Sequence, residues 1–201
     1  MRRTCGLVLV LVVGIVGAAE QAAPDKEKTP DYYPLKPGTK WFYEMNANGQ
    51  KIKMNNQVAK IETLDGKSLA MVETVINGSV AGTEHMSATD KGVFRHRANG
   101  VECSPPVCIL KYPFKKDETW ETETTIGNET VKVKAKAVDS EEITVSAGKY
   151  KTVRADVETT FMGNQFVATY WFAPDVGVVK QTMVIMGKNI SLELEKFEAG
   201  K

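Results

Sequence analysis

The sequence has 201 residues, of which 42% are hydrophobic, and it carries 26 Lys and Arg residues against 25 Asp and Glu residues. A nearly neutral chain lacks the clustered positive field that nucleic acids and anionic membrane surfaces require, so we expect neither as a partner. The roughly 180 residues that follow a short leader are enough for one domain with a sizeable core.

Residues 1–19 have the features of a secretory signal peptide. Arg2 and Arg3 precede an uncharged, mostly apolar run that ends in small residues near Ala19. This run, residues 4–19, is shorter than the roughly 20 residues needed to span a bilayer, which favours a cleaved signal over a retained anchor. We therefore predict a secreted or periplasmic protein with no transmembrane segment after cleavage.

Residues 20–31 are charged, contain proline and lack large apolar side chains, which predicts a disordered tether. Residues 32–201 form a series of short segments of alternating polarity, and no segment has a helical apolar period. We predict a single all-β domain in which about ten or more strands form an antiparallel meander, shaped as a curved sheet, half-barrel or barrel. The expected hairpin turns are Asn48-Gly49, Asp65-Gly66, Asn77-Gly78, Asn99-Gly100, Gly127-Asn128, Gly163-Asn164 and Gly187-Lys188.

The turns also predict strand register. If Gly127-Asn128 is a two-residue turn, Glu123 lies opposite Lys132 and Trp120 lies opposite Ala135. One face of this hairpin then carries opposite charges and the other carries apolar side chains, as expected for a sheet with one solvated and one packed face.

The hairpin at Asn48-Gly49 follows the same pattern. It pairs Tyr43 with Met54 on the inner face, and Trp41 shares that face because it lies two residues before Tyr43. We therefore expect both Trp41 and Trp120 to point inward.

The chain also shows signs of an internal duplication into units 32–110 and 111–201. Trp41 aligns with Trp120, and the segment from Val72 to Arg95 matches residues 157–180 at 8 of 24 positions without a gap. Because self-similarity at a fixed offset is typical of repeated structural units, we predict two copies of one β unit.

Three motifs stand out in the predicted β domain: Tyr33-Pro34-Leu35-x-x-Gly38-x-x-Trp41-x-Tyr43, Ala147-Gly148-x-Tyr150 and Tyr170-Trp171-x-Ala173-Pro174-x-Val176-Gly177-x-Val179-Lys180. These motifs resemble those of uncharacterised exported β-rich proteins of bacteria. Some of those proteins are similar in outline to the curved half-barrels of periplasmic lipoprotein carriers. The resemblance implies an exported, curved β domain, although the carriers also have helices that close the barrel and none is predicted here.

Two cysteines remain after the predicted signal peptide. Cys103 and Cys108 are separated by four residues, and an oxidising compartment would favour a disulfide between them. The alternative is a zinc site with His85 and His96, but their spacing matches no compact set of ligands. We predict the disulfide and no metal.

The sequence contains no recognisable catalytic machinery. It lacks a Gly-x-Ser-x-Gly elbow, a complete Gly-x-x-x-x-Gly-Lys-Ser/Thr phosphate-binding loop and a His-Glu-x-x-His pair. Glu121 and Glu123 could flank a glycosidic bond, but the lysines predicted opposite them account for both carboxylates. We predict that the protein is not an enzyme and has no cofactor.

A curved sheet with no helix to cover it leaves a concave apolar face. We expect that face to bind an apolar small molecule or lipid, lined by Trp41, Tyr43, Trp120 and Trp171. The alternative is a structural or protein-interaction component of the envelope whose core fills itself. In either case we expect a monomer.

Overall fold

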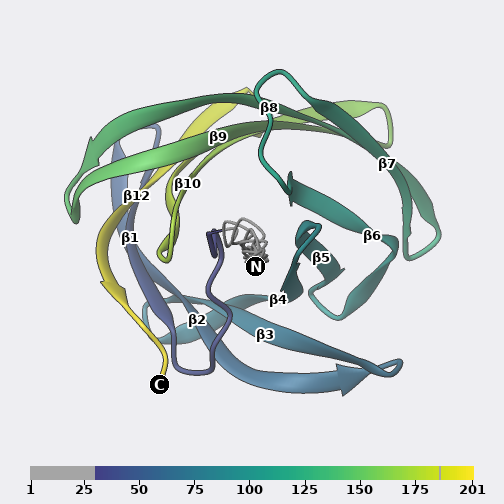
Figure 1. Cartoon of the computed structure of the whole chain (residues 1–201), viewed down its shortest axis with the longest axis horizontal. Coiled ribbons are helices and arrows are strands. Elements are labelled where there is room, and N and C mark those ends of the chain that lie inside the picture. The colour runs from purple at the N-terminus through teal and green to yellow at the C-terminus, as the bar shows by residue number, and fades with distance from the viewer. Residues whose placement is uncertain (1–29, 186) are drawn as a thin grey trace, which may run out of the picture.

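A computed structural model describes residues 30–185 and 187–201. The predicted signal peptide and most of the predicted tether lie outside these residues. Twelve antiparallel strands form a closed meander barrel, which confirms the predicted all-β class (Figure 1). The strands are β1 (Lys40–Ala47), β2 (Gln50–Leu64), β3 (Lys67–Ile76), β4 (Ser79–Thr89), β5 (Gly92–Ala98), β6 (Val101–Lys111), β7 (Thr119–Ile126), β8 (Glu129–Val145), β9 (Gly148–Phe161), β10 (Asn164–Ala173), β11 (Gly177–Ile185) and β12 (Lys188–Glu198).

The barrel closes between the first and last strands. β1 pairs with β2 on one side and with β12 on the other, in a register that runs from Lys40 opposite Glu198 to Ala47 opposite Ile190. Closure removes the unpaired edges of an open sheet, which would otherwise be exposed to pairing with other chains. Among the described residues there is no helix long and apolar enough to span a membrane.

The predicted hairpin registers are confirmed. Trp120 lies opposite Ala135 and Glu123 lies opposite Lys132, whose Nζ is 3.6 Å from the Glu123 carboxylate. In the first hairpin Tyr43 lies opposite Met54 as predicted.

Most predicted turns also have the expected backbone. At Asn48-Gly49 both φ angles are positive, at 53° and 87°, as a type I′ turn requires. The turn predicted at Gly163-Asn164 instead lies at Met162-Gly163, because a type I′ turn places its glycine second and Asn164 already belongs to β10.

The junction between β6 and β7 is the shortest strand pairing in the barrel. Only Cys103 with Ile126 and Ser104 with Thr125 are paired. Elsewhere along this junction, two side chains of β7 donate hydrogen bonds to backbone carbonyls of β6. Trp120 Nε1 donates to the Cys108 carbonyl at 2.9 Å, and the Thr124 hydroxyl donates to the Pro105 carbonyl at 2.7 Å. These bonds link β7 to two β6 residues that have no ladder partner on β7.

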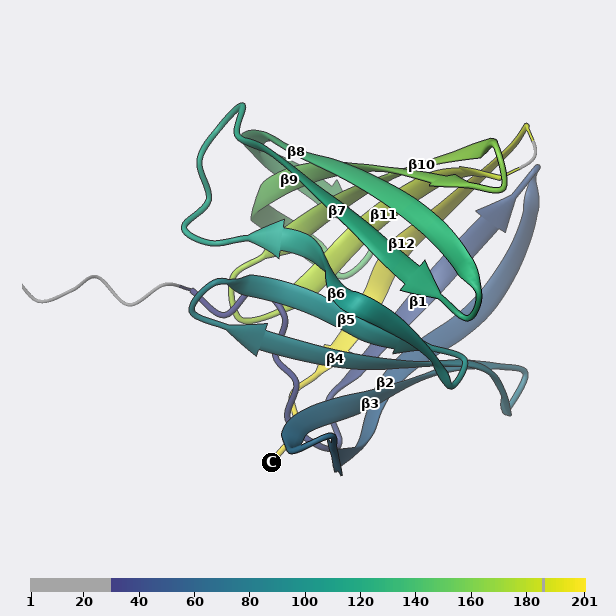
Figure 2. The same ribbon diagram turned by 90° about the vertical axis from the view of Figure 1, so that its right-hand side faces the viewer.

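One end of the barrel, here called the closed end, is filled by the chain itself. Residues 30–39 run across it before β1 begins, and Figure 1 shows this segment inside the ring of strands. The Asp31 carbonyl accepts a hydrogen bond from Asp175 N at 2.7 Å. The ring of Tyr33 stacks on the ring of Trp41, with 5.3 Å between the ring centroids. Figure 2 shows the N-terminal segment and the C-terminus at this same end.

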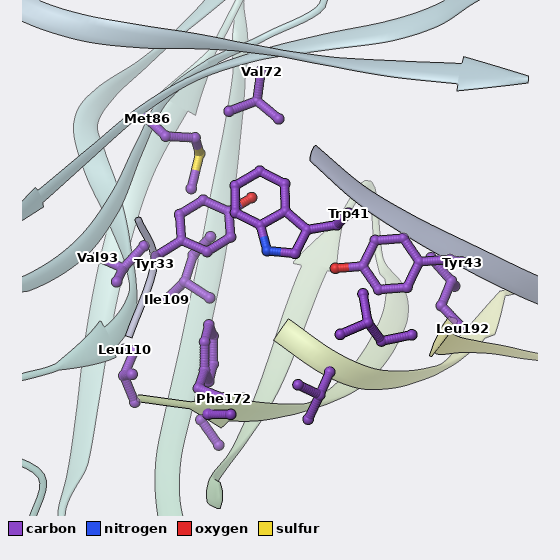
Figure 3. Close-up of a cluster of buried hydrophobic side chains, with 14 of the residues drawn as sticks. Tyr33, Trp41, Tyr43, Val72, Met86, Val93, Ile109, Leu110, Phe172 and Leu192 are labelled. Atoms are coloured by element: carbon purple, nitrogen blue, oxygen red, sulfur yellow. The ribbon is translucent and has the colours of Figure 1, made fainter. Parts of the chain in front are cut away.

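Trp41 lies at the centre of the packing at the closed end. Its side chain has no accessible surface, and its Nε1 donates to the Val176 carbonyl at 2.5 Å. Figure 3 shows its indole between Tyr33 and Tyr43, with Met86 and Phe172 nearby. All of these neighbours are buried.

Each predicted unit supplies half of the strands, β1 to β6 and β7 to β12. Trp41 and Trp120 are each the second residue of the first strand in their unit. Their indoles nevertheless donate to different places, the turn after β10 for Trp41 and the middle of β6 for Trp120. The duplication therefore stays a prediction.

Candidate ligand cavity

A cavity of about 580 Å³ occupies the part of the barrel that the closed-end packing leaves free. Tyr33, Tyr43, Met86 and Phe172 form its floor. Its outer lining consists of residues next to the hairpin turns at the opposite end, which are only half-buried. These outer residues are Ile76, Ala98, Ile126, Phe166, Ile185 and Ile190. The gradient from buried floor to half-buried rim shows that the cavity opens at this end, here called the mouth.

Aliphatic and aromatic side chains from most of the strands make up the cavity wall. Val131, Val133 and Val157 project from β8 and β9, while Met45 and Leu192 project from β1 and β12. Their inward direction follows from strand alternation, since the residues between them carry the charges of the outer surface. A mostly apolar wall with a few polar groups is typical of small-molecule sites.

Two charged residues of neighbouring strands interrupt this wall. Glu84 of β4 and Arg95 of β5 form an ion pair, with Arg95 Nε 2.7 Å from Glu84 Oε1. The N–H does not point at that oxygen, so Arg95 Nε has no hydrogen-bond partner among the described residues. The side chains of Arg95 and Glu84 keep 29% and 34% of their surface accessible although they lie inside the barrel, because that surface faces the cavity.

Electrostatics keep the Arg95 guanidinium charged at this depth. The carboxylate of Glu84 raises the pKa of Arg95, and this effect outweighs the opposing effect of burial. Tyr170, which also lines the cavity, has a pKa raised by burial, as has Tyr33 in the floor. The cavity therefore offers one cation beside one carboxylate, together with neutral phenols.

The structure brings only one of the four predicted lining residues into the cavity wall. Tyr43 lies in the floor and donates its hydroxyl to the Val178 carbonyl at 2.7 Å. Trp41 lies behind that floor, fully buried. Trp120 is directed inward but packs at the junction of β6 and β7.

Trp171 is on the outer surface. Its indole donates to Glu141 Oε1 at 2.8 Å, and the cations of Arg154 and Lys180 lie 5.6 Å and 5.8 Å from its ring centroid. Alternation along β10 explains this placement, because the cavity-lining residues Tyr170 and Phe172 flank it.

The predicted disulfide is not present in the structure. Cys103 and Cys108 are both buried free thiols. They face opposite sides of β6: Cys103 lines the cavity, whereas Cys108 lies between the cavity-lining residues Val107 and Ile109 and so points the other way. A disulfide needs its two Cβ atoms to point toward each other. The earlier interpretation assumed a loop between them, but this segment is β6.

The alternative zinc site does not assemble either. Among residues 30–185 and 187–201, no three His, Cys, Asp or Glu side chains are grouped to hold a metal ion. His85 Nε2 lies 2.7 Å from the Glu62 carboxylate, and His96 Nε2 lies 2.8 Å from the Ser87 hydroxyl.

Glu84 and Arg95 were missed in the sequence, although a signal was present. Glu84 lies two residues before Met86, and Arg95 lies two residues after Val93, so each is in phase with an apolar inward residue. A charge of each sign on the inner face of the β4–β5 hairpin indicates a buried ion pair.

Comparison with solved structures supports the fold. The chain is similar to a predicted lipoprotein from Parabacteroides distasonis ATCC 8503, with a TM-score of 0.56 and 14% identity over 86% of this chain and 100% of that one. It is also similar to a predicted exported protein with a YmcC-like fold from Bacteroides fragilis NCTC 9343, with a TM-score of 0.50 and 12% identity over 84% and 99% of the two chains. No protein-family model matches the chain, and no curated protein sequence matches it. At these identities the likeness concerns the fold alone.

Proposed function

We propose that this protein is an exported, non-catalytic binding module that holds an apolar or lipid-like ligand in its barrel, in the cell envelope. The observation that carries the proposal is the cavity itself. Its volume of about 580 Å³ lies within the roughly 300–1,000 Å³ of small-molecule sites. Its wall is mainly aliphatic and aromatic, so an apolar ligand would exchange water contacts for apolar ones there.

Two observations support the exported setting. The N-terminal 19 residues have the pattern of a signal peptide. Two structures that share the barrel fold belong to proteins described as a predicted lipoprotein and a predicted exported protein.

The residues that line the cavity favour binding over catalysis. None of the described lining residues is a histidine, and the only lining thiol, Cys103, has a pKa raised by burial. A thiol that stays protonated is a poor nucleophile. The alternative of a self-filled structural barrel describes the closed end well, but it leaves the cavity near the mouth unexplained.

A matched pair of substitutions on β9 tests the proposal. Thr159 lines the cavity, while its neighbour Thr160 lies opposite the exposed Lys132 on the outer face. Thr159→Phe should weaken binding of an uncharged apolar dye such as Nile red by at least about tenfold, because the new ring occupies the cavity. Thr160→Phe should change the affinity by less than about twofold.

Titration of dye fluorescence measures both affinities. Native mass spectrometry of protein purified from its own envelope would look for a co-purifying apolar molecule. Failure of the unmodified protein to bind the dye, combined with a clean ligand-free mass, would reject the binding function and favour the structural alternative.

A further inference from the structure

The Glu84–Arg95 pair limits which ligand head group the cavity can accept, provided that the proposed binding function holds. Both side chains face the cavity, and their charges lie 2.7 Å apart at the nearest atoms. The Tyr170 phenol lines the cavity close to the guanidinium, since it contributes to the raised Arg95 pKa. The charged groups therefore form one cluster in a mainly apolar wall, whose other polar residues, Asn56, Thr74, Thr159 and Gln181, are uncharged.

A charged head group gains little from this cluster. An anion that approaches Arg95 must also approach the carboxylate of Glu84, and a cation that approaches Glu84 must also approach the guanidinium. The two interactions with the fixed pair largely cancel, because opposite charges so close together act as a dipole at longer range. The head group would meanwhile lose its hydration, which is costly for an ion that finds no unpaired counter-charge.

A neutral polar head group does not meet this difficulty. A hydroxyl or primary amide has both a donor and an acceptor, so it can donate to Glu84 and accept from the guanidinium of Arg95. The guanidinium of Arg95 carries five N–H donors and its side chain keeps 29% of its surface accessible, so the cluster retains donors for a ligand. Bonds to charged partners are among the stronger hydrogen bonds.

We infer that the cavity selects an uncharged amphiphile, an aliphatic chain that ends in a hydroxyl or amide group, over fatty acids and fatty amines. The polar head would lie against Glu84, Arg95 and Tyr170, while the chain would contact the apolar wall. Monoacylglycerols, fatty alcohols and fatty amides have this chemistry.

The test compares three probes that share one C18 chain and differ only in the head group. Displacement of Nile red from the purified protein, below the aggregation concentration of each probe, gives the affinities for 1-monoolein, oleate and oleylamine. We expect 1-monoolein to bind at least about tenfold more tightly than either charged probe. Equal affinities, or tighter binding of oleate or oleylamine, would overturn the inference and leave the proposed function in place. If Nile red and all three probes fail to bind, the proposed function itself is rejected.

Single substitutions should then weaken this selection. Glu84→Gln leaves Arg95 unpaired and should raise the affinity for oleate by about tenfold, whereas Arg95→Gln should do the same for oleylamine. Glu121→Gln is the matched control, because Glu121 pairs with Lys134 at 3.5 Å on the outer face. An unchanged preference in both folded cavity variants would contradict the assigned role of the pair. If either variant fails to fold, as judged by circular dichroism, the ranking of the three head groups on the unmodified protein decides.

Discussion

Trp41→Phe and Trp171→Phe are the same chemical change at two tryptophans of very different surroundings. Trp41 is fully buried and its Nε1 donates to the Val176 carbonyl, whereas Trp171 is half-exposed and its Nε1 donates to Glu141 at the surface. We predict that Trp41→Phe is strongly destabilising and that Trp171→Phe is nearly neutral.

The magnitudes follow from the contacts of each ring. Removal of the Trp41 donor leaves a buried carbonyl without that partner, which costs about 1–3 kcal/mol. The smaller ring also gives up buried area equivalent to one or two methylene groups, at roughly 0.8 kcal/mol each. The sum is about 2–5 kcal/mol, a large part of the roughly 5–15 kcal/mol by which most proteins are stable.

The corresponding loss at Trp171 is smaller. Phenylalanine keeps part of the attraction to Arg154 and Lys180, and such contacts at exposed sites are worth only about 0.5–1 kcal/mol. The hydrogen bond to Glu141 is exposed, so water can replace it. We therefore expect a cost below about 1 kcal/mol.

Urea unfolding followed by far-ultraviolet circular dichroism measures both changes without relying on the altered fluorophores. For a slope of about 2–3 kcal/mol per molar urea, Trp41→Phe should lower the midpoint by about 1 M and Trp171→Phe by less than about 0.5 M. Equal shifts for the two variants, with unchanged slopes, would refute the assignment of Trp41 to the packed core and of Trp171 to the surface.

Three further predictions concern the backbone, the thiols and pH. Gly92→Ala should lower the urea midpoint far more than Gly49→Ala. A Cβ at Gly92 would collide with the Leu110 carbonyl of β6, whereas a Cβ at Gly49 meets nothing within 4 Å. Similar shifts of the two midpoints would contradict the close approach of β5 and β6. In protein that lacks residues 1–19, and therefore lacks Cys5, both Cys103 and Cys108 should resist thiol reagents at pH 8, since both are buried and burial raises the pKa of Cys108 to about 11. After unfolding in urea, two thiols per chain should react. If no thiol reacts after unfolding, the two cysteines form a disulfide. Surface carboxylates such as that of Asp117 have a pKa lowered by hydrogen bonds from lysine. The stability that they contribute should therefore be present above about pH 4 and lost as pH falls through the folded pKa. A urea midpoint that does not change down to about pH 2 would contradict this.

The local features of the fold could be predicted because they depend on residues close in sequence. The Gly127-Asn128 turn fixes the pairing of Trp120 with Ala135, since a two-residue loop leaves only one register. Closure of the barrel could not be predicted in this way. It depends on β1 pairing with β12, about 150 residues away, and no short-range pattern encodes that contact.

The candidate site was predicted only in outline. Alternation identifies which residues point inward, but it does not say whether they meet across the barrel or leave a space. The outcome here depends on Tyr33, which comes from the segment before β1 and fills the closed end while the mouth stays hollow. Choosing residues by size also misled the prediction at Trp171, where alternation within β10 favours Phe172 as the inward aromatic.

Both ends of the described chain are fixed at the closed end of the barrel. The Asp31 carbonyl accepts from Asp175 N, and Gly200 N donates to the Thr39 hydroxyl at 3.1 Å. An affinity tag joined directly to Pro30 or to Lys201 would therefore lie on the side away from the mouth. Protein immobilised on a solid support through either tag presents the same face to the solution, so the cavity stays accessible in surface-based binding experiments.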